Sequence, residues 1–271
     1  MGGQVRDRIC SAAEAMADVH DGAVVAAHCW GACGTPGYLF RALAARGAKD
    51  LTFCCTNFLP GPPGLEDIGF PDPTILLPQL KKVITPFLGA RAFRGVLGED
   101  FLGDRVKSGQ LEIEATTHGS LMERFHAGAM ELGGFYSPVG LRTVVEKGKE
   151  KRVIDGKEYI LEKPIRPDVG LVKALKADRL GNLVYRGSAR ASNPVIAMAS
   201  RLTIVEVWEV VEVGELDPEM IVTPGIYVDR IVRIPDEAPV SAKRVEELFK
   251  NFARELVGFG TESADLQGGQ E

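Results

Sequence analysis

The chain has 271 residues, a formal net charge of −5, 45% hydrophobic residues and 25% charged residues. This composition is typical of a globular protein with a substantial core and excludes a wholly disordered or fibrous chain. The mixed, mildly acidic charge gives no electrostatic footprint for nucleic acid. No stretch approaches the roughly 18 apolar residues of a membrane span, and the charged N-terminus lacks an apolar signal core. We therefore expect a cytoplasmic protein that binds neither nucleic acid nor a membrane.

The N-terminal part of the chain alternates between helical and extended patterns. Helical spacing of apolar residues predicts helices over 4–18 and 38–46, and short apolar runs predict strands over 23–27 and 51–55. A glycine-rich turn separates the first strand from the second helix. This alternation indicates an α/β fold with a largely parallel, mixed sheet.

A proline-rich stretch follows over residues 58–78. It contains six prolines, each of which lacks a backbone N–H and restricts the residue before it. Regular structure is therefore not expected throughout this stretch. A long irregular segment inside a compact domain is usually functional or mobile, but a surface insertion without a role is an equal alternative.

The rest of the chain also alternates, up to a distinct C-terminal segment. Extended patterns are predicted over 81–87, 111–115, 169–174, 183–185, 202–207 and 227–234, with a helix over 120–132. Asp155-Gly156 suits the two-residue turn of a β-hairpin over 153–160. Apolar residues between Val245 and Val257 share one face of an amphipathic helix. We thus predict one α/β domain over 1–234, a helical extension over 235–259 and a disordered tail over 260–271.

The cysteines do not form a metal-binding pattern. There are five, an odd number that is typical of reduced thiols in a chain without an export signal: Cys10, Cys29, Cys33, Cys54 and Cys55. Their spacing does not match a tetrahedral zinc site, so no metal is expected. His28 beside Cys29 suggests a ligand pair or a Cys–His nucleophile. The more common alternative, which we favour, is that these are small buried residues at strand ends.

The glycine turn only loosely matches a dinucleotide-binding motif. Gly31, Gly34 and Gly37 follow a strand and open a helix, where backbone N–H groups could meet a phosphate. The first two glycines are spaced by two residues rather than one, and Asp50 precedes the second strand instead of ending it. Nicotinamide cofactors are therefore disfavoured. The residues alone indicate an α/β protein with a glycine-rich turn at a strand's carboxyl end.

Several longer segments resemble the α (A) subunit of family I 3-oxoacid CoA-transferases. They keep that family's order from about residue 20 to 234, and together they are specific although each alone is weak. The matching segments are Cys33-Gly34-Thr35-Pro36, residues 117–128 (Thr-His-Gly-Ser-Leu-Met-Glu-Arg-Phe-His-Ala-Gly), residues 135–140 (Phe-Tyr-Ser-Pro-Val-Gly), residues 173–178 with 181–183, residues 188–190 with 193–194, and residues 214–229 (Gly-Glu-Leu-Asp-Pro-Glu-Met-Ile-Val-Thr-Pro-Gly-Ile-Tyr-Val-Asp).

This resemblance implies a three-layer α/β/α fold and a division of labour between two subunits. The family pairs its α subunit with a similarly folded β subunit, and the resemblance suggests a complex of two α with two β. A β-subunit glutamate attacks the acyl-CoA, gives an acyl-glutamyl anhydride and then a glutamyl-CoA thioester, and a carboxylic acid finally takes the CoA. Coenzyme A is a substrate, and no other cofactor is implied. The present chain lacks the Glu-Asn-Gly segment that carries this glutamate, so we expect it to be catalytically incomplete alone.

The resemblance also implies site residues. His118, followed by Gly119, stands where the family has a glutamine that lines the acyl pocket, and Asn57 is retained from an asparagine pair that ends the second strand. Gly31, Cys33, Gly34 and Pro36 belong to the active-site turn.

Several residues depart from the family around the expected site. The usual Gly-Gly-Phe-Gly is His28-Cys29-Trp30-Gly31 in this chain, and the proline-rich stretch replaces a different loop. We therefore expect an altered acyl substrate, bulkier or aromatic, contacted by Trp30 and Phe58.

Three alternative functions stay open at this point. In a CoA-transferase-like hydrolase, water or the substrate itself would replace the second acid, with His118 as a base. A ligand-sensing domain is possible because related folds occur in sugar-phosphate sensors, although no basic recognition helix is present. A scaffold that only holds a catalytic partner would tolerate changes at His118 and Asn57.

Overall fold

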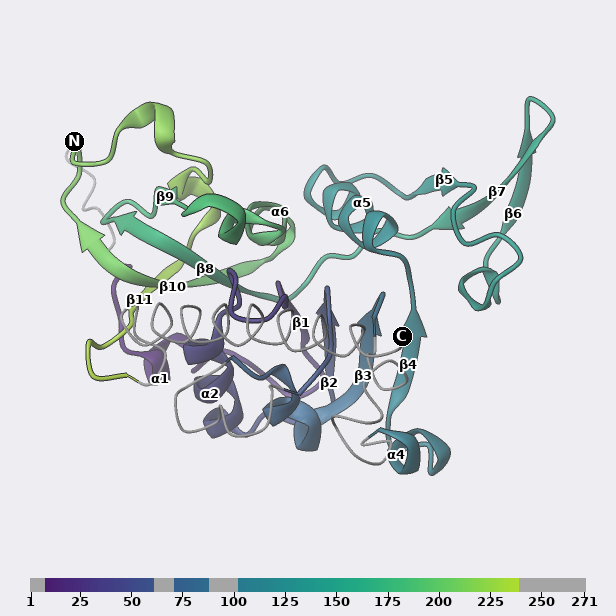
Figure 1. Cartoon of the computed structure of the whole chain (residues 1–271), viewed down its shortest axis with the longest axis horizontal. Helices are drawn as coiled ribbons and strands as arrows, with labels where there is room; N and C mark the ends of the chain where they lie inside the picture. Colours follow the sequence, from purple (N-terminus) through teal and green to yellow (C-terminus); the bar gives the residue numbers. More distant parts are fainter. Residues whose placement is uncertain (1–7, 61–70, 88–101, 239–271) are drawn as a thin grey trace, which may run out of the picture.

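The computed structural model describes residues 8–60, 71–87 and 102–238. Its centre is an eight-stranded sheet (Figure 1) in which seven strands run parallel in the order β11-β10-β8-β1-β2-β3-β4 and β9 pairs antiparallel with β8. These strands are β1 (Val24–Ala27), β2 (Leu51–Cys55), β3 (Leu80–Thr85), β4 (Glu112–Ala115), β8 (Val169–Asp178), β9 (Leu183–Val184), β10 (Leu202–Val211) and β11 (Arg230–Arg233). The predicted largely parallel sheet is confirmed.

Helices cover both faces of this sheet. One face carries α1 (Ala12–Ala15), α2 (Gly37–Arg46) and the 3-10 helix η1 (Pro73–Gln79), and the other carries α5 (His118–Ala129) and α6 (Asn193–Ala199), as Figure 1 shows. Short helices complete the structure at α4 (Gly103–Lys107), η2 (Val144–Glu146), η3 (Gly187–Arg190), η4 (Pro218–Met220) and η5 (Gly225–Tyr227). The molecule is therefore the expected three-layer α/β/α protein.

Strand alternation divides the core into two clusters. Val25 and Phe53, which are paired in register, point toward α2, whereas their neighbours Ala26 and Cys54 point toward α5 and α6. Both sets are fully buried. Because both faces of these parallel strands are covered, their sequences are mostly apolar rather than alternating.

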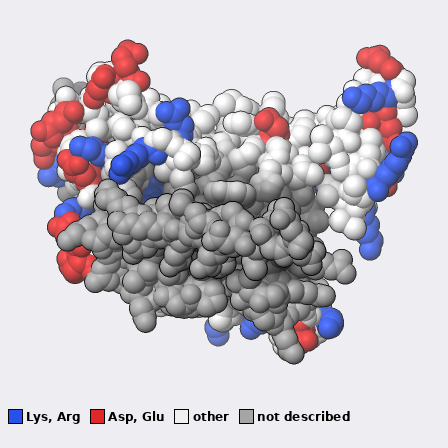
Figure 2. Space-filling model, in the orientation of Figure 1, with Lys and Arg blue, Asp and Glu red and all other residues white. Residues whose placement is uncertain are grey.

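A smaller antiparallel sheet extends from the central one. Its strands are β5 (Phe135–Ser137), β6 (Lys151–Ile154) and β7 (Lys157–Glu162) in the order β5-β7-β6. Figure 1 shows it as an arm beyond α5, and Figure 2 shows charged side chains at its far end. The predicted hairpin is confirmed: Asp155 and Gly156 have φ of 50° and 76°, as a primed two-residue turn requires.

The predicted helix over 4–18 is wrong for most of the residues that the structure describes. Ile9 pairs in parallel with Ile231, and the N–H of Cys10 donates to the Ile231 carbonyl, so the chain is extended along the edge strand β11. Helix α1 begins only after Ser11, which forms a capping box with Glu14. Hydrogen bonding to the open edge of β11 therefore outweighs the helical preference that the spacing of apolar residues indicates for residues 8–10.

Other differences lie at the ends of elements. Within the proline-rich stretch, residues 61–70 lie outside the described part, and 73–79 form η1, capped by Asp72 through the Thr74 N–H. The extended patterns over 81–87 and 227–234 shorten to β3 and β11. The predicted C-terminal helix and tail also lie outside the described residues. Among those described, no helix is both long and apolar enough to cross a membrane.

Candidate functional site

Two aromatic rings meet at the carboxyl edge of the central sheet. Trp30 follows β1 and His118 follows β4, with β2 and β3 between their strands. Their ring centroids are nevertheless 6.3 Å apart at an interplanar angle of 76°, an edge-on arrangement. Ligands of open α/β sheets bind outside the carboxyl ends of the strands. This pair therefore marks the candidate site.

Both rings are accessible. Trp30 is 57% exposed, which is unusual for the largest apolar side chain, and His118 is also exposed. His118 is the first residue of α5, whose N-cap Thr117 accepts from the Ser120 N–H at 3.2 Å. Gly119 is exposed, and a side chain built there would meet nothing within 4 Å. The positive end of the twelve-residue helix α5 thus faces open space beside the imidazole.

The glycine turn that carries Trp30 is held by buried side chains. Trp30 donates its N–H to Thr35 Oγ1 at 3.1 Å. Asn193, fully buried at the start of α6, donates from Nδ2 to the Gly34 carbonyl at 3.0 Å and accepts from the Lys173 N–H at 3.0 Å. A Cβ at Gly34 would lie 2.3 Å from the Ala189 carbonyl oxygen, and φ there is +70°. Glycine is therefore required at this position by close packing.

The other predicted turn residues lie around this contact. Gly31 is exposed with a φ of 55°, and Pro36 is buried directly before α2. Cys33 is half-buried, with Sγ 3.3 Å from Ser188 Oγ of η3. The turn is thus braced by two segments that lie more than 150 residues further along the chain.

His28 has a structural position rather than a reactive one. Its Nδ1 lies 2.9 Å from Ser192 Oγ and 3.4 Å from Thr56 Oγ1. Burial lowers the pKa of His28 to about 4, with a smaller opposing effect from a backbone hydrogen bond to Cys33. Thr56 in turn bonds the N–H and carbonyl of Cys29. The imidazole is therefore neutral near pH 7 and ties the ends of β1, β2 and α6 together.

The cysteines at the strand ends are buried, as the favoured interpretation predicts. Cys29, Cys54 and Cys55 are buried and free. Burial raises the pKa of the Cys29 and Cys54 thiols, which disfavours the nucleophilic thiolate. Within the described ranges, no group of three His, Cys, Asp or Glu side chains is placed to hold a metal ion.

The pKa of His28 predicts acid sensitivity. Its folded-state pKa lies below the ordinary value of 6.5, so the unfolded state binds the proton first as the pH falls. This group should therefore cost about 2 kcal/mol of stability between about pH 7 and about pH 5. Urea unfolding at both pH values should show a smaller loss for His28→Asn than for the wild type. The exposed His20→Asn variant is the control, and an equal loss in all three proteins would contradict the assignment.

Two buried polar atoms at the same edge have no hydrogen-bond partner among the residues that the structure describes. Asn57 Oδ1 and Thr116 Oγ1 find no hydrogen-bond partner within residues 8–60, 71–87 and 102–238, although buried polar atoms are normally paired. Asn57 follows β2 and Thr116 follows β4. Thr116 was not predicted from the sequence; its only signal is its place between the alternating strand and the N-cap Thr117.

Phe58 is not part of this accessible group. Its side chain is fully buried and packs edge-on against Phe53, with ring centroids 6.1 Å apart, in the core under α2. A fully buried ring cannot touch a substrate directly. The placement of Phe58 therefore disagrees with the expectation that it contacts the acyl group. Trp30, by contrast, has the exposure that such a contact needs.

The fold and this edge together define a three-layer α/β protein with a ligand site at the carboxyl ends of its parallel strands. The chain belongs to the coenzyme A transferase family, whose sequence pattern it matches over residues 9–233. It is 41% identical over 226 residues to the α (A) subunit of the probable succinyl-CoA:3-ketoacid coenzyme A transferase of Bacillus subtilis, covering 83% of this chain and 88% of that one. It is 38% identical over 232 residues to the α (A) subunit of the 3-oxoadipate CoA-transferase of Pseudomonas putida, covering 85% and 95%.

A solved structure shares the fold. The acyl-CoA transferase of Escherichia coli O157:H7, in its thioester complex with CoA, superposes with a TM-score of 0.71 at 21% identity. The match covers 86% of this chain and 51% of that one, so the present chain spans about half the length of that enzyme. The comparison supports the three-layer architecture described above.

Proposed function

We propose that this chain is the α subunit of a hetero-oligomeric enzyme that moves CoA between an acyl-CoA and a carboxylic acid. The observation that carries the proposal is the family match over 9–233, which includes both segments that bear the Trp30–His118 pair. Relatives at about 40% identity are named as α (A) subunits of CoA-transferases. We further propose a complex of two α with two β subunits in the cytoplasm.

The nucleophile belongs to the partner in this proposal. The carboxylate of a β-subunit glutamate attacks the thioester carbonyl, and the released CoA thiolate then forms a glutamyl-CoA thioester while the first acid leaves. The acceptor acid takes the CoA from that thioester and frees the glutamate. Splitting the transfer in this way replaces one difficult step by easier ones. The anhydride requires protection from water, which an interface between the two subunits over the sheet edge would supply.

This chain supplies a hydrogen-bond donor for the developing oxyanion and part of the surface that binds the acyl group. His118 donates a hydrogen bond to the carbonyl oxygen on which charge develops, helped by the positive end of α5. Asn57 and Thr116 contribute polar atoms that have no partner within the described structure. Trp30 offers an exposed indole as an apolar surface, which favours acids with a bulky or aromatic acyl group.

The test is CoA transfer from acetyl-CoA or succinyl-CoA to a panel of carboxylic acids. The chain is assayed alone and after co-expression with a candidate β subunit that contains Glu-Asn-Gly. Activity only in the mixture, dependent on an acceptor and higher for bulky acids, is expected. Full activity of the chain alone would refute the division of labour. A preference for acetoacetate or succinate would refute the proposed substrate class.

A hydrolase is the second candidate, because the exposed imidazole of His118 could act as a base toward water. The same assay separates the two functions. Release of free CoA without an acceptor acid would favour the hydrolase. A transferase instead passes the CoA to the acceptor acid, so its product is a new acyl-CoA.

A further inference from the structure

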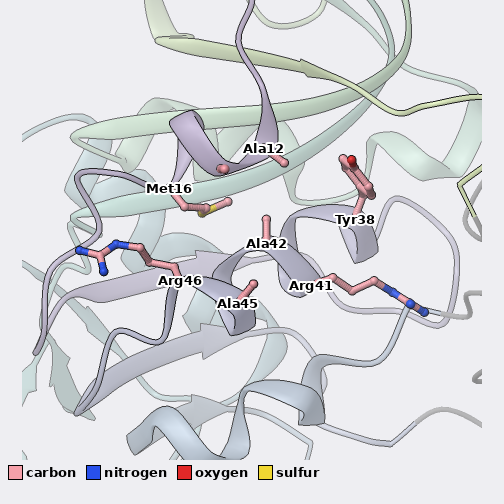
Figure 3. Close-up of a pocket in the computed structure, with 8 residues that line it drawn as sticks. Ala12, Met16, Tyr38, Arg41, Ala42, Ala45 and Arg46 are labelled. Carbon is pink, nitrogen blue, oxygen red and sulfur yellow. The ribbon is translucent and has the colours of Figure 1, made fainter.

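A groove opens between α1 and α2, on the outer surface of the helical layer. Its volume is about 380 Å³, and its wall consists mainly of small or apolar side chains: Ala12, Ala13, Met16, Tyr38, Ala42 and Ala45, with Arg41 and Arg46. In Figure 3, Met16 and Ala42 point toward each other across the groove, while Arg46 and Arg41 extend to opposite sides of it. An apolar groove between two charged ends is suited to an amphipathic segment.

The described chain ends beside this groove. Ile234 and Ala238 form a small buried cluster with Tyr38 and Trp208. Tyr38 therefore belongs both to that cluster and to the groove wall. Ala238 is the last described residue, so the chain continues from a point next to the groove.

The sequence that follows has the pattern of a groove-binding helix. At about 100° per residue, Val245, Leu248, Phe249, Phe252 and Leu256 share one narrow stripe of a helix. Glu246 and Glu255 fall on the two borders of that stripe, where they can meet the arginines of α2. Residues 245–257 would span about 20 Å as a helix, against about 15 Å for the ten residues of α2.

We propose that residues 239–257 form an amphipathic helix that seats its apolar stripe in the α1–α2 groove of the same chain. We choose this segment rather than a partner protein because the last described residue, Ala238, packs in a cluster with Tyr38, which lines the groove. The segment would brace α2, which begins directly after the turn that carries Trp30. It lies beyond residues 9–233, which match the family.

Photocrosslinking of the full chain tests this proposal. A benzoylphenylalanine in place of Phe249 keeps an aromatic group on the stripe and should crosslink to peptides that contain residues 12–16 or 38–46 of the same chain. The matched control places the analogue at Lys250, on the opposite face, and should give at least tenfold less of this product. Crosslinks to a second copy, or to an added β subunit, would overturn the proposal, as would equal yields at both positions.

Hydrogen exchange gives an independent measurement. The double variant Phe249→Asp, Phe252→Asp should exchange several-fold faster than the wild type over residues 38–46, because the groove loses its cover. The control Lys250→Asp, Arg254→Asp changes the opposite face and should exchange like the wild type. Unchanged exchange in the phenylalanine variant would overturn the proposal.

Discussion

Replacing Glu206 by glutamine should lower the free energy of unfolding by about 3–5 kcal/mol, the cost of leaving a buried charge without its partner. Glu206 on β10 is fully buried, and its Oε1 lies 2.7 Å from the Nζ of Lys173 on β8. Its Oε2 accepts from the Leu39 N–H in the first turn of α2 at 2.9 Å. The variant would leave the buried ammonium of Lys173 without its carboxylate partner and would remove negative charge from the start of α2.

A second ion pair on the same two strands provides the control. Lys176 and Glu209 lie 2.7 Å apart, but their side chains are 39% and 53% exposed. Solvent screens this pair, so Glu209→Gln should change the free energy of unfolding by less than about 1 kcal/mol. Urea unfolding of both variants measures the difference. Equal effects at the two positions would show that burial does not set the strength of the Lys173–Glu206 pair.

His118→Ala should reduce kcat/KM for CoA transfer by about 10²–10³-fold in the complete enzyme, the usual cost of losing one donor to a developing oxyanion. His118→Gln should recover most of the activity, because an amide can still donate. If His118 is instead a base, glutamine cannot replace it, and His118→Gln should be as inactive as His118→Ala.

The same helix offers a matched control. His126 is also exposed on α5, with Nδ1 3.3 Å from Glu123 Oε1, but it lies at the other end of the helix. His126→Ala should therefore leave kcat/KM unchanged. Wild-type activity in His118→Ala would support the scaffold interpretation, in which this chain only holds its catalytic partner.

The two predictions concern connected parts of one structure. Glu206 holds the start of α2, and the turn directly before α2 carries Trp30, which contacts His118 edge-on. Asn193 links the same turn to β8 through the Lys173 N–H. Buried polar contacts of Glu206 and Asn193 thus hold the turn that carries the accessible ring of Trp30.

The local pattern of the sequence was sufficient for most of the central fold. The apolar runs at 23–27 and 51–55 became adjacent parallel strands, and Asp155-Gly156 formed the turn of a hairpin. These features depend on the conformational preferences and apolar pattern of residues that are adjacent in the chain, so they can be predicted from the sequence. The segment around Ile9 was predicted wrongly because its structure depends on β11, more than 200 residues away.

Some features of the site could likewise be predicted from the sequence, whereas others depend on contacts between distant segments. By itself, the sequence determined that this is a parallel α/β chain with a glycine turn after its first strand, and its motifs placed His118 and Asn57 in the expected family positions. Only the tertiary structure decided that Trp30 reaches His118 across two intervening strands, that Phe58 is buried and that Thr116 Oγ1 has no hydrogen-bond partner in the described part of the chain. Exposure and hydrogen-bond partners arise from packing between distant segments, and no local pattern of residues encodes them.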